Sequence, residues 1–233
     1  MGGWELLELP PPISSMEKTH AIFFKPPLEI NFLGHQMAEI YRDRVYASAL
    51  EGKKDLTIID CGANIGLTTY YFSQFAKIVY SIEPSKEHFE ILQKMVEFNK
   101  LTNVNLINKA IYIKKGNFPF GGPIQNKTMK SLHMATWQDG KPEETVETLT
   151  FKDLFEENKI SHVDLLKLDI EGTETEVISH TSFTEVAPKI NTVIVERHGW
   201  SGRHENQLIE AFKNAGYQIK PIIGSADLLI ATR

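Results

Sequence analysis

The sequence lacks the features that would place it in a membrane, an oxidising compartment or a nucleic-acid complex. No apolar run approaches the roughly 20 residues that a membrane-spanning helix needs, and no basic-then-apolar signal pattern opens the chain. The only cysteine, Cys61, excludes an intrachain disulfide and suits a reducing cytoplasm. Basic residues number 25 against 30 acidic ones, and the net charge of −5 argues against a substrate held through phosphates. We therefore expect a cytoplasmic protein with no membrane span and no nucleic-acid partner.

The 233 residues suffice for one globular domain with a lead-in, which could itself be a domain of a larger enzyme. Within residues 1–50, a proline-rich and irregular lead-in runs to about Gly34, and a helix is expected at Met37–Leu50, packed on the core. Residues 51–233 alternate short apolar strands with helices, which predicts an α/β fold with a mostly parallel sheet. The expected strands are Leu56–Cys61, Ile78–Ile82, Val104–Asn108, Val146–Thr150, Val163–Leu168, Thr192–Glu196, Tyr217–Ile223 and Asp227–Ala231, the last two antiparallel at the sheet edge. The expected helices are Leu67–Phe75, Lys86–Asn99, Phe151–Asn158, Thr173–His180 and Ser201–Ala215.

The segment Lys115–Glu144 interrupts this alternation. It is rich in glycine and proline and has little periodicity, so we expect a long loop. Such a loop is often functional, and this one is a candidate lid over an acceptor, with Trp137 as a sugar-stacking residue. The alternative for Trp137 is an ordinary half-buried aromatic side chain.

The run from Asp60 to Gly66 (Asp60-Cys61-Gly62-Ala63-Asn64-Ile65-Gly66), which we call the glycine turn, follows one strand and opens one helix. Glycines there let backbone approach a ligand, and a helix N-terminus offers free N–H groups. The turn is not the GxGxxG of dinucleotide enzymes, because Asn64 replaces the second glycine. Glu83 ends the next strand about 20 residues later, a spacing that suits hydrogen bonds to ribose hydroxyls. The alternative for Glu83 is a plain strand-terminal glutamate.

Two further residues near these strand ends have competing interpretations. Asn108, in Asn108-Lys109-Ala110, follows the third strand, where its amide could pair with an adenine edge. It could equally be an ordinary turn asparagine. Cys61 could be a nucleophile, but it has no paired base in the sequence and is better interpreted as a small buried filler.

Acidic residues and a histidine follow two other buried strands. Asp169 and Glu171 follow Val163–Leu168, and Glu196 and His198 end the next strand. Because ligands bind outside the carboxyl ends of parallel strands, these four side chains are expected to converge. They could act as a general base on a hydroxyl, hold a divalent cation, or form salt bridges with Arg197 or Lys167. Nearby, Glu174 and Glu176 are interpreted as acids that favour the start of a helix, with Thr173 and Glu176 as a capping box.

Together these motifs resemble the FkbM-type methyltransferases, a branch of the class I S-adenosylmethionine-dependent enzymes. The resemblance runs from about Met37 to the C-terminus. Its pieces are the glycine turn, Glu83-Pro84, Asn108-Lys109-Ala110, Val146–Thr150, Leu166–Glu174 and the pair Glu196 and His198. Leu166-Lys167-Leu168-Asp169-Ile170-Glu171-Gly172-Thr173-Glu174 is the most specific of them. Cys61 departs from the small apolar residue that is usual in the family.

The resemblance implies a Rossmann-like seven-stranded sheet in the order 3-2-1-4-5-7-6, with an antiparallel last strand and helices on both faces. It implies S-adenosylmethionine as cofactor and methyl transfer, often to a hydroxyl of a sugar or a polyketide-like metabolite. The expected cofactor-binding residues are Asp60, Gly62, Ala63, Asn64, Gly66, Thr68, Glu83, Pro84, Ser85, Asn108, Ala110 and Asp169. Asp169, Glu171, Glu196 and His198 are the expected catalytic residues and the candidate ligands of a divalent cation.

We therefore expect an S-adenosylmethionine-dependent O-methyltransferase that acts on a small-molecule or glycan hydroxyl by in-line displacement. Three alternatives belong to other classes. A binding module could keep the cofactor fold without turnover, a nicotinamide oxidoreductase is disfavoured by the missing GxGxxG, and the methyl acceptor could instead be RNA or protein.

Overall fold

The computed structural model describes residues 5–9, 20–24, 30–123, 130–132, 140–198, 205–223 and 225–233. Trp137 and residues 201–204, the expected start of the last helix, lie outside these ranges. In the described part of the chain, no helix combines the length and apolarity that crossing a bilayer requires.

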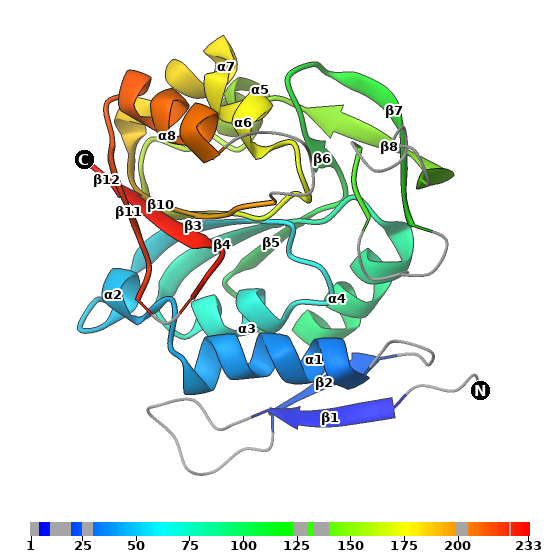
Figure 1. Cartoon of the computed structure of the whole chain (residues 1–233). Coiled ribbons are helices and arrows are strands. Elements are labelled where there is room, and N and C mark those ends of the chain that lie inside the picture. Colours follow the sequence, from blue (N-terminus) through cyan, green and yellow to red (C-terminus); the bar gives the residue numbers. More distant parts are fainter. Residues whose placement is uncertain are drawn as a thin grey trace.

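A seven-stranded sheet forms the centre of the molecule (Figure 1). Its strands are β3 (Leu56–Cys61), β4 (Ala76–Ile82), β5 (Val104–Ile107), β9 (Val163–Leu168), β10 (Ile190–Glu196), β11 (Gln218–Pro221) and β12 (Leu228–Thr232). They lie in the order β11-β12-β10-β9-β3-β4-β5. β12 is antiparallel to both of its neighbours, and the other pairs are parallel. Numbered within this sheet, the order is 3-2-1-4-5-7-6. Numbered along the chain from β3, it is 3-2-1-7-8-10-9, because β6, β7 and β8 intervene in the sequence and form a separate sheet. The expected strand Val146–Thr150 corresponds to the end of β8, in that second sheet.

Helices cover both faces of the sheet and bury a core on each (Figure 1). One layer contains α5 (Phe151–Glu157), α6 (Glu174–Ser179), α7 (Thr181–Thr184), a 3-10 turn (Ala187–Lys189) and α8 (Glu205–Asn214). The other contains α1 (Ile30–Met37), α2 (Ala47–Leu50), α3 (Leu67–Ser73) and α4 (Lys86–Phe98). In β3, Ile59 faces the first core and Ile58 the second, so both faces of this strand are buried. A strand buried on both faces reads as a continuous apolar run, which is why these strands were predictable.

The prediction of a long loop at Lys115–Glu144 is wrong at both ends of this segment, which form strands. β7 (Gly116–Pro123) and β8 (Gly140–Leu149) pair antiparallel, and β8 also pairs with β6 (Ala110–Ile111). The pairing sets Phe118 opposite Val146, and Phe120 and Val146 join Ala110 in a small core. The glycines and prolines of this segment obscured the alternation of its apolar residues, and the two strands are distant in sequence.

The N-terminal segment is more regular than the expected irregular lead-in. β1 (Glu5–Leu9) and β2 (His20–Phe24) pair antiparallel, and α1 begins at Ile30, before the expected helix. The expected helix Met37–Leu50 is divided into the end of α1, a π-helical turn at Ala38–Arg42 and α2. Arg44 has a positive φ of 53°, which ends the helical path between them.

Candidate active site

The glycine turn places its backbone directly against the end of β9. Gly62 has a φ of 76°, and a Cβ there would lie 1.7 Å from the carbonyl oxygen of Asp169. Asn64 and Gly66 also have positive φ angles, of 51° and 99°. The N–H groups of Gly62 and Ala63 both donate to the carbonyl of Ile82, at 3.0 Å each. Glycine is therefore required at position 62 for close packing as well as for its backbone conformation.

Asp60 and Thr68 lie behind this turn. The Asp60 side chain is fully buried, and its Oδ2 accepts hydrogen bonds from Thr68 (2.8 Å) and Thr69 (2.7 Å). These bonds tie the last residues of β3 to the first turn of α3. Two residues expected to contact cofactor thus organise the turn in this structure.

Glu83 presents a buried carboxylate at the end of β4. Its Oε2 accepts the N–H of Asn64 and its Oε1 accepts the N–H of Ser85, both at 2.9 Å. Burial raises the pKa of Glu83 to about 7, against the lowering effect of these two bonds. Each carboxylate oxygen keeps acceptor capacity for one more donor, which is what two neighbouring ribose hydroxyls would need.

Asn108 braces the residues around Glu83. Its side-chain amide donates to the carbonyls of Glu83 (2.9 Å) and Pro84 (3.1 Å). These backbone contacts agree with the alternative interpretation of Asn108 as a turn asparagine. Cys61 is also structural, because it is fully buried and burial raises the pKa of its thiol well above the ordinary value.

A pocket opens between the glycine turn and the β6-β8-β7 sheet, and its empty space of about 580 Å³ includes open solvent. It is lined by Gly62, Asn64, Glu83, Pro84, Ala110, Asp169 and Glu171, all expected site residues, and also by His88, Phe120 and Lys130. Within the described residues, the buried atoms Asn64 Oδ1 and Ser85 Oγ have no hydrogen-bond partner. An elongated polar ligand with an apolar ring fits this set, because acceptors line one part of the wall and apolar side chains another.

The expected convergence of four side chains is confirmed. His198 Nε2 lies 3.2 Å from Glu171 Oε2, 3.7 Å from Asp169 Oδ1 and 3.8 Å from Glu196 Oε1. Asp169 and Glu171 follow β9, Glu196 is the last residue of the adjacent parallel strand β10, and His198 follows it. We call Asp169, Glu171, Glu196 and His198 the acid–histidine cluster.

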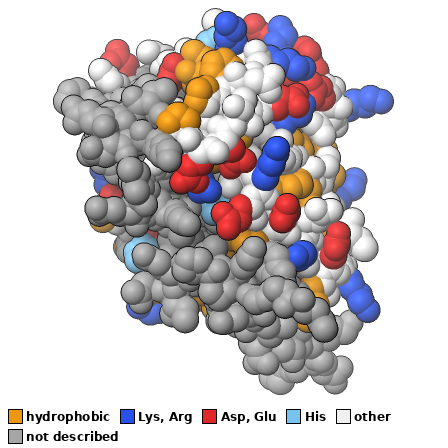
Figure 2. Space-filling view, turned by 90° about the vertical axis from the view of Figure 1, so that its right-hand side faces the viewer, with side chains coloured by type: hydrophobic (Ala, Val, Ile, Leu, Met, Phe, Trp, Pro, Cys, Tyr) orange, Lys and Arg blue, Asp and Glu red, His pale blue; other side chains and the backbone are white. Residues whose placement is uncertain are grey.

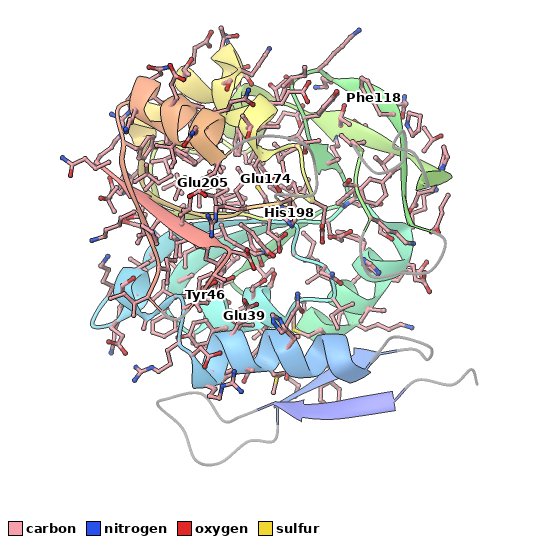
Figure 3. All side chains as sticks on the ribbon, viewed as in Figure 1. Glu39, Tyr46, Phe118, Glu174, His198 and Glu205 are labelled. Carbon is pink, nitrogen blue, oxygen red and sulfur yellow. The ribbon has the colours of Figure 1, made fainter. Side chains whose placement is uncertain are left out.

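Glu174 is a partner of this cluster that the sequence interpretation missed. Its Oε1 lies 2.9 Å from His198 Nδ1, and the carboxylate also accepts the N–H groups of Ile170 and Gly172. The expected capping box is wrong, because Thr173 makes no side-chain cap and Glu174 satisfies the backbone instead. The signal was present: Glu174 follows a glycine bend, so the bend returns its carboxylate toward β10. Figure 3 shows Glu174 and His198 close together above the sheet.

The charges of the cluster determine its protonation. Burial alone would lower the pKa of His198, but the hydrogen bond and charge of Glu174, with those of Asp169 and Glu171, raise it to about 10. Burial, followed by the charge of Asp169, raises the pKa of Glu171 to about 8. Burial would also raise the pKa of Asp169, but Lys167 and His198 outweigh it and hold the pKa below its ordinary value. The charge of Asp169, followed by burial, raises the pKa of Glu196 to about 9. Near neutral pH, His198 is therefore a cation and Asp169 is ionised, whereas Glu171 and Glu196 are largely protonated and become proton acceptors as the pH rises.

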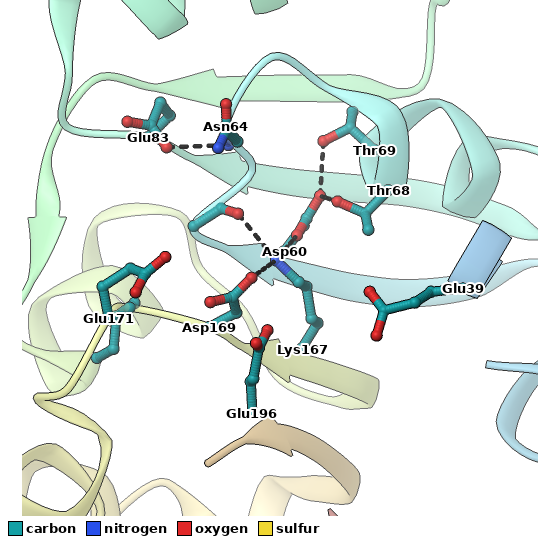
Figure 4. Close-up of polar contacts among 12 residues, drawn as sticks. Glu39, Asp60, Asn64, Thr68, Thr69, Glu83, Lys167, Asp169, Glu171 and Glu196 are labelled. Atoms are coloured by element: carbon teal, nitrogen blue, oxygen red, sulfur yellow. Dashed lines mark hydrogen bonds and ion pairs between the residues drawn. The ribbon is translucent and has the colours of Figure 1, made fainter. Parts of the chain in front are cut away.

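Glu39 is a second residue that the sequence interpretation missed. It lies on the π-helical turn after α1, and its side chain is 33% exposed. Burial, and then the charges of Asp169 and Asp227, raise its pKa against the lowering effects of His35 and Lys167. Figure 4 shows Glu39 on the N-terminal segment, across from Asp169 and Glu196. No motif marks it, since only the tertiary fold brings this turn to the ends of β9 and β10.

Three residues of the cluster also have the composition of a cation site. One ligand atom from each of Asp169, Glu196 and His198 lies within 4.8 Å of the others in the described part of the chain. Carboxylate oxygens with one imidazole suit a divalent cation. Deprotonation of His198 would have to accompany such binding.

The comparisons with known proteins agree with this arrangement. A sequence model of the FkbM methyltransferase domain matches residues 60–219. No curated protein sequence gives a significant match. The chain resembles the magnesium protoporphyrin IX methyltransferase of Synechocystis PCC 6803, solved with bound S-adenosylmethionine, at 14% identity and a TM-score of 0.51, over 86% of this chain and 80% of the other.

A second solved structure has a longer chain. The 16S rRNA N2 G1207 methyltransferase of T. thermophilus is 12% identical with a TM-score of 0.50, over 100% of this chain and 51% of that one. At such identities these likenesses show the fold, a class I methyltransferase fold with a mostly parallel sheet. The match over residues 60–219 is more specific, since it includes the glycine turn, Glu83 and the whole acid–histidine cluster. The chain belongs to the FkbM family of methyltransferases and is an S-adenosylmethionine-dependent enzyme.

Proposed function

We propose that this enzyme is an O-methyltransferase that acts on a hydroxyl of a neutral sugar, glycan or related metabolite. The observation that carries the proposal is the juxtaposition of the pocket beside the glycine turn with the acid–histidine cluster. Asp169 and Glu171 belong to both, since they line the pocket and contact His198. A methyl group delivered from the pocket would therefore arrive beside the proton-accepting carboxylates.

The pocket residues suit S-adenosylmethionine. In this proposal Glu83 accepts hydrogen bonds from the ribose hydroxyls, and Gly62, Ala63, Asn64 and Gly66 bring the turn close to the methionine part. Pro84 and Ala110 line the adenosine part, where Phe120 adds an aromatic wall, and Ser85 lies behind Pro84 with its N–H donated to Glu83. When bound, the cofactor supplies a methyl group on a sulfonium, which is already activated for transfer.

The chain supplies alignment and proton acceptance. Holding the acceptor oxygen in line with the sulfur–methyl bond is worth roughly 7–11 kcal/mol in favourable cases. The ionised form of Glu171 or Glu196, which becomes more populated as the pH rises toward 8 and 9, accepts the hydroxyl proton, a contribution of about 10²–10⁴-fold. His198 keeps a positive charge between these carboxylates, and Glu174 orients its ring. Asp169 remains ionised at the junction of the two sites.

A divalent cation is a second candidate for the same step. The grouping of Asp169, Glu196 and His198 favours it. There the cation would replace the proton of His198 and acidify the acceptor hydroxyl. Dialysis against EDTA followed by return of Mg²⁺ or Mn²⁺ separates the two mechanisms: turnover that survives EDTA supports the carboxylate base, and turnover that only metal restores supports the cation.

The acceptor class follows from the charge of the opening. Figure 2 shows acidic side chains near the middle of this face of the molecule, with lysine and arginine side chains among them. In the described residues at this opening, Lys167 and His198 are both paired with acids, and Arg197 is paired with Glu205. Free hydroxyl donors satisfy carboxylates, whereas phosphates would meet like charge. A neutral polyol is therefore the favoured acceptor.

Calorimetric titration with S-adenosylmethionine and S-adenosylhomocysteine tests the cofactor site. We expect micromolar binding of both, and Glu83→Ala should abolish it while circular dichroism and the melting temperature remain near those of the wild type. A panel of neutral glycans and polyols with radiolabelled cofactor then tests the acceptor. Absence of cofactor binding by the folded wild type would refute the assigned pocket, and labelling of RNA or protein alone would refute the acceptor class.

A further inference from the structure

Lys167 is a buried ammonium at the boundary between the cofactor pocket and the acid–histidine cluster. It lies on β9, its side chain is 5% exposed, and it does not line the pocket. A buried lysine is costly unless its charge is compensated. The acids Asp169 and Asp60 outweigh the effect of burial and hold the pKa of Lys167 well above its ordinary value, so it is charged.

Resting on the proposed function, we propose that Lys167 is a positioning residue that fixes the glycine turn and the acid–histidine cluster relative to each other. Its Nζ donates to the carbonyl of Gly62 at 2.8 Å and lies 3.1 Å from Asp169 Oδ2 (Figure 4). Gly62 belongs to the turn and Asp169 to the cluster. A single ammonium group therefore contacts both halves of the site.

The distances distinguish positioning from simple charge balance. Asp60 is the fully buried acid that needs a counter-ion, yet its Oδ1 is the most distant of the three partners, at 3.5 Å from Nζ. The two shorter contacts go to Gly62 and Asp169. Asp60 is bound instead by the hydroxyls of Thr68 and Thr69. The ammonium group therefore lies closer to the glycine turn and to the acid–histidine cluster than to Asp60.

The backbone around Lys167 transmits this placement. β9 and β3 are parallel neighbours in which Asp60 is opposite Lys167, and the N–H of Asp169 donates to the carbonyl of Cys61 at 3.2 Å. A Gly62 carbonyl without its donor can rotate, and Asp169 without its partner can turn toward His198. A misplacement of about 1 Å in such a site costs roughly 10²-fold in rate.

The test starts with Lys167→Met, which keeps the length of the side chain and removes its donors. We expect the Kd of S-adenosylhomocysteine to rise about tenfold and kcat on the acceptor found in the glycan panel to fall roughly 10²-fold. Lys152→Met is the matched control, because Lys152 forms an exposed ion pair with Glu185 and should leave both quantities unchanged. Wild-type values in a folded Lys167→Met protein would overturn the proposal.

A double variant separates positioning from folding. Lys167→Met leaves Asp60 as an uncompensated buried charge, which can lower stability or prevent folding. In Asp60→Asn with Lys167→Met that charge is gone, and the amide oxygen can still accept from Thr68 and Thr69. We expect the melting temperature to recover while cofactor affinity and kcat stay low. Recovery of affinity and kcat together with stability would overturn the positioning role. If the wild type itself binds no cofactor, the proposed function fails instead.

Discussion

The protonation of Glu83 should control cofactor affinity near neutral pH. Its pKa is raised to about 7 in the free protein, and the ionised carboxylate is the form that accepts two hydroxyl hydrogen bonds. Below pH 7 a proton must be lost before binding, so the Kd of S-adenosylhomocysteine should rise up to about tenfold for each pH unit. Above pH 7 it should level off. His88, the nearby histidine, has a pKa lowered to about 4 by burial and by Lys130, so it remains neutral across this window.

Calorimetry from pH 5.5 to 8.5 measures this dependence, with Glu83→Gln as the matched variant. The amide cannot ionise, so its weaker binding should be independent of pH over the same window. A wild-type affinity that is flat through pH 6 would contradict the proposed coupling between protonation of Glu83 and cofactor binding.

Gly62 should tolerate no side chain. Alanine there would adopt a positive φ, at a cost of about 1–2 kcal/mol, and its Cβ would overlap the carbonyl oxygen of Asp169. Gly52 is the control, since its φ is 73° and a Cβ there meets nothing within 4 Å. In chemical denaturation, we expect Gly52→Ala to lower the free energy of unfolding only by the cost of the positive φ angle. Gly62→Ala should lose more and should bind no cofactor; equal losses for the two variants would contradict the close packing of the turn.

At the scale of elements, the π-helical turn Ala38–Arg42 should contribute to acceptor binding. π-helical turns are rare and are often found at functional sites, and this one carries the partly buried Glu39. We expect Glu39→Gln to raise the acceptor KM several-fold and to leave the Kd of S-adenosylhomocysteine unchanged, because Glu39 does not line the cofactor pocket. Glu210→Gln, an exposed change on α8, is the control. A change in cofactor affinity with an unchanged KM would place Glu39 elsewhere in the mechanism.

The central strands and the two glutamates Glu39 and Glu174 show which parts of the site the sequence could and could not predict. The strands β3, β4, β9 and β10 are buried on both faces, so their composition alone identified them, and the residues after them were correctly expected to converge. Glu39 and Glu174 acquire their places from packing between distant elements. No motif marks Glu39, whereas the glycine bend before Glu174 was a signal that the sequence interpretation did not use.

The β6-β8-β7 sheet illustrates a different limit. β7 and β8 are joined by residues 124–139 and are rich in glycine and proline at their ends, features typical of loops. Their pairing depends on Phe118 facing Val146 across the two strands, a long-range contact that periodicity does not reveal. Phe120 and Lys130 of this region line the pocket. Because this sheet was not predicted from the sequence, these two lining residues were not predicted either.

At the scale of the whole molecule, the distribution of charge should select the acceptor. The chain carries a net charge of −5, and Glu39, Asp169, Glu171 and Glu196 gather at one end of the sheet. Asp169 stays ionised there, and the three glutamates, whose pKa values are raised, add negative charge as the pH rises. Two unit charges of like sign roughly 8 Å apart repel by about 2 kcal/mol at an effective dielectric constant of about 20. That energy corresponds to roughly thirtyfold in kcat/KM.

A phosphorylated form of a neutral acceptor should therefore be a poor substrate. We expect its kcat/KM to be at least thirtyfold below that of the unphosphorylated form, and the difference to shrink as salt screens the exposed part of the repulsion. Glu39→Gln should recover part of the lost kcat/KM for the phosphorylated acceptor, because one carboxylate of the opening is removed. Glu210→Gln should recover none of it. A phosphorylated acceptor used as well as the neutral one at low salt would mean that acceptors reach the methyl group by a path that avoids these carboxylates.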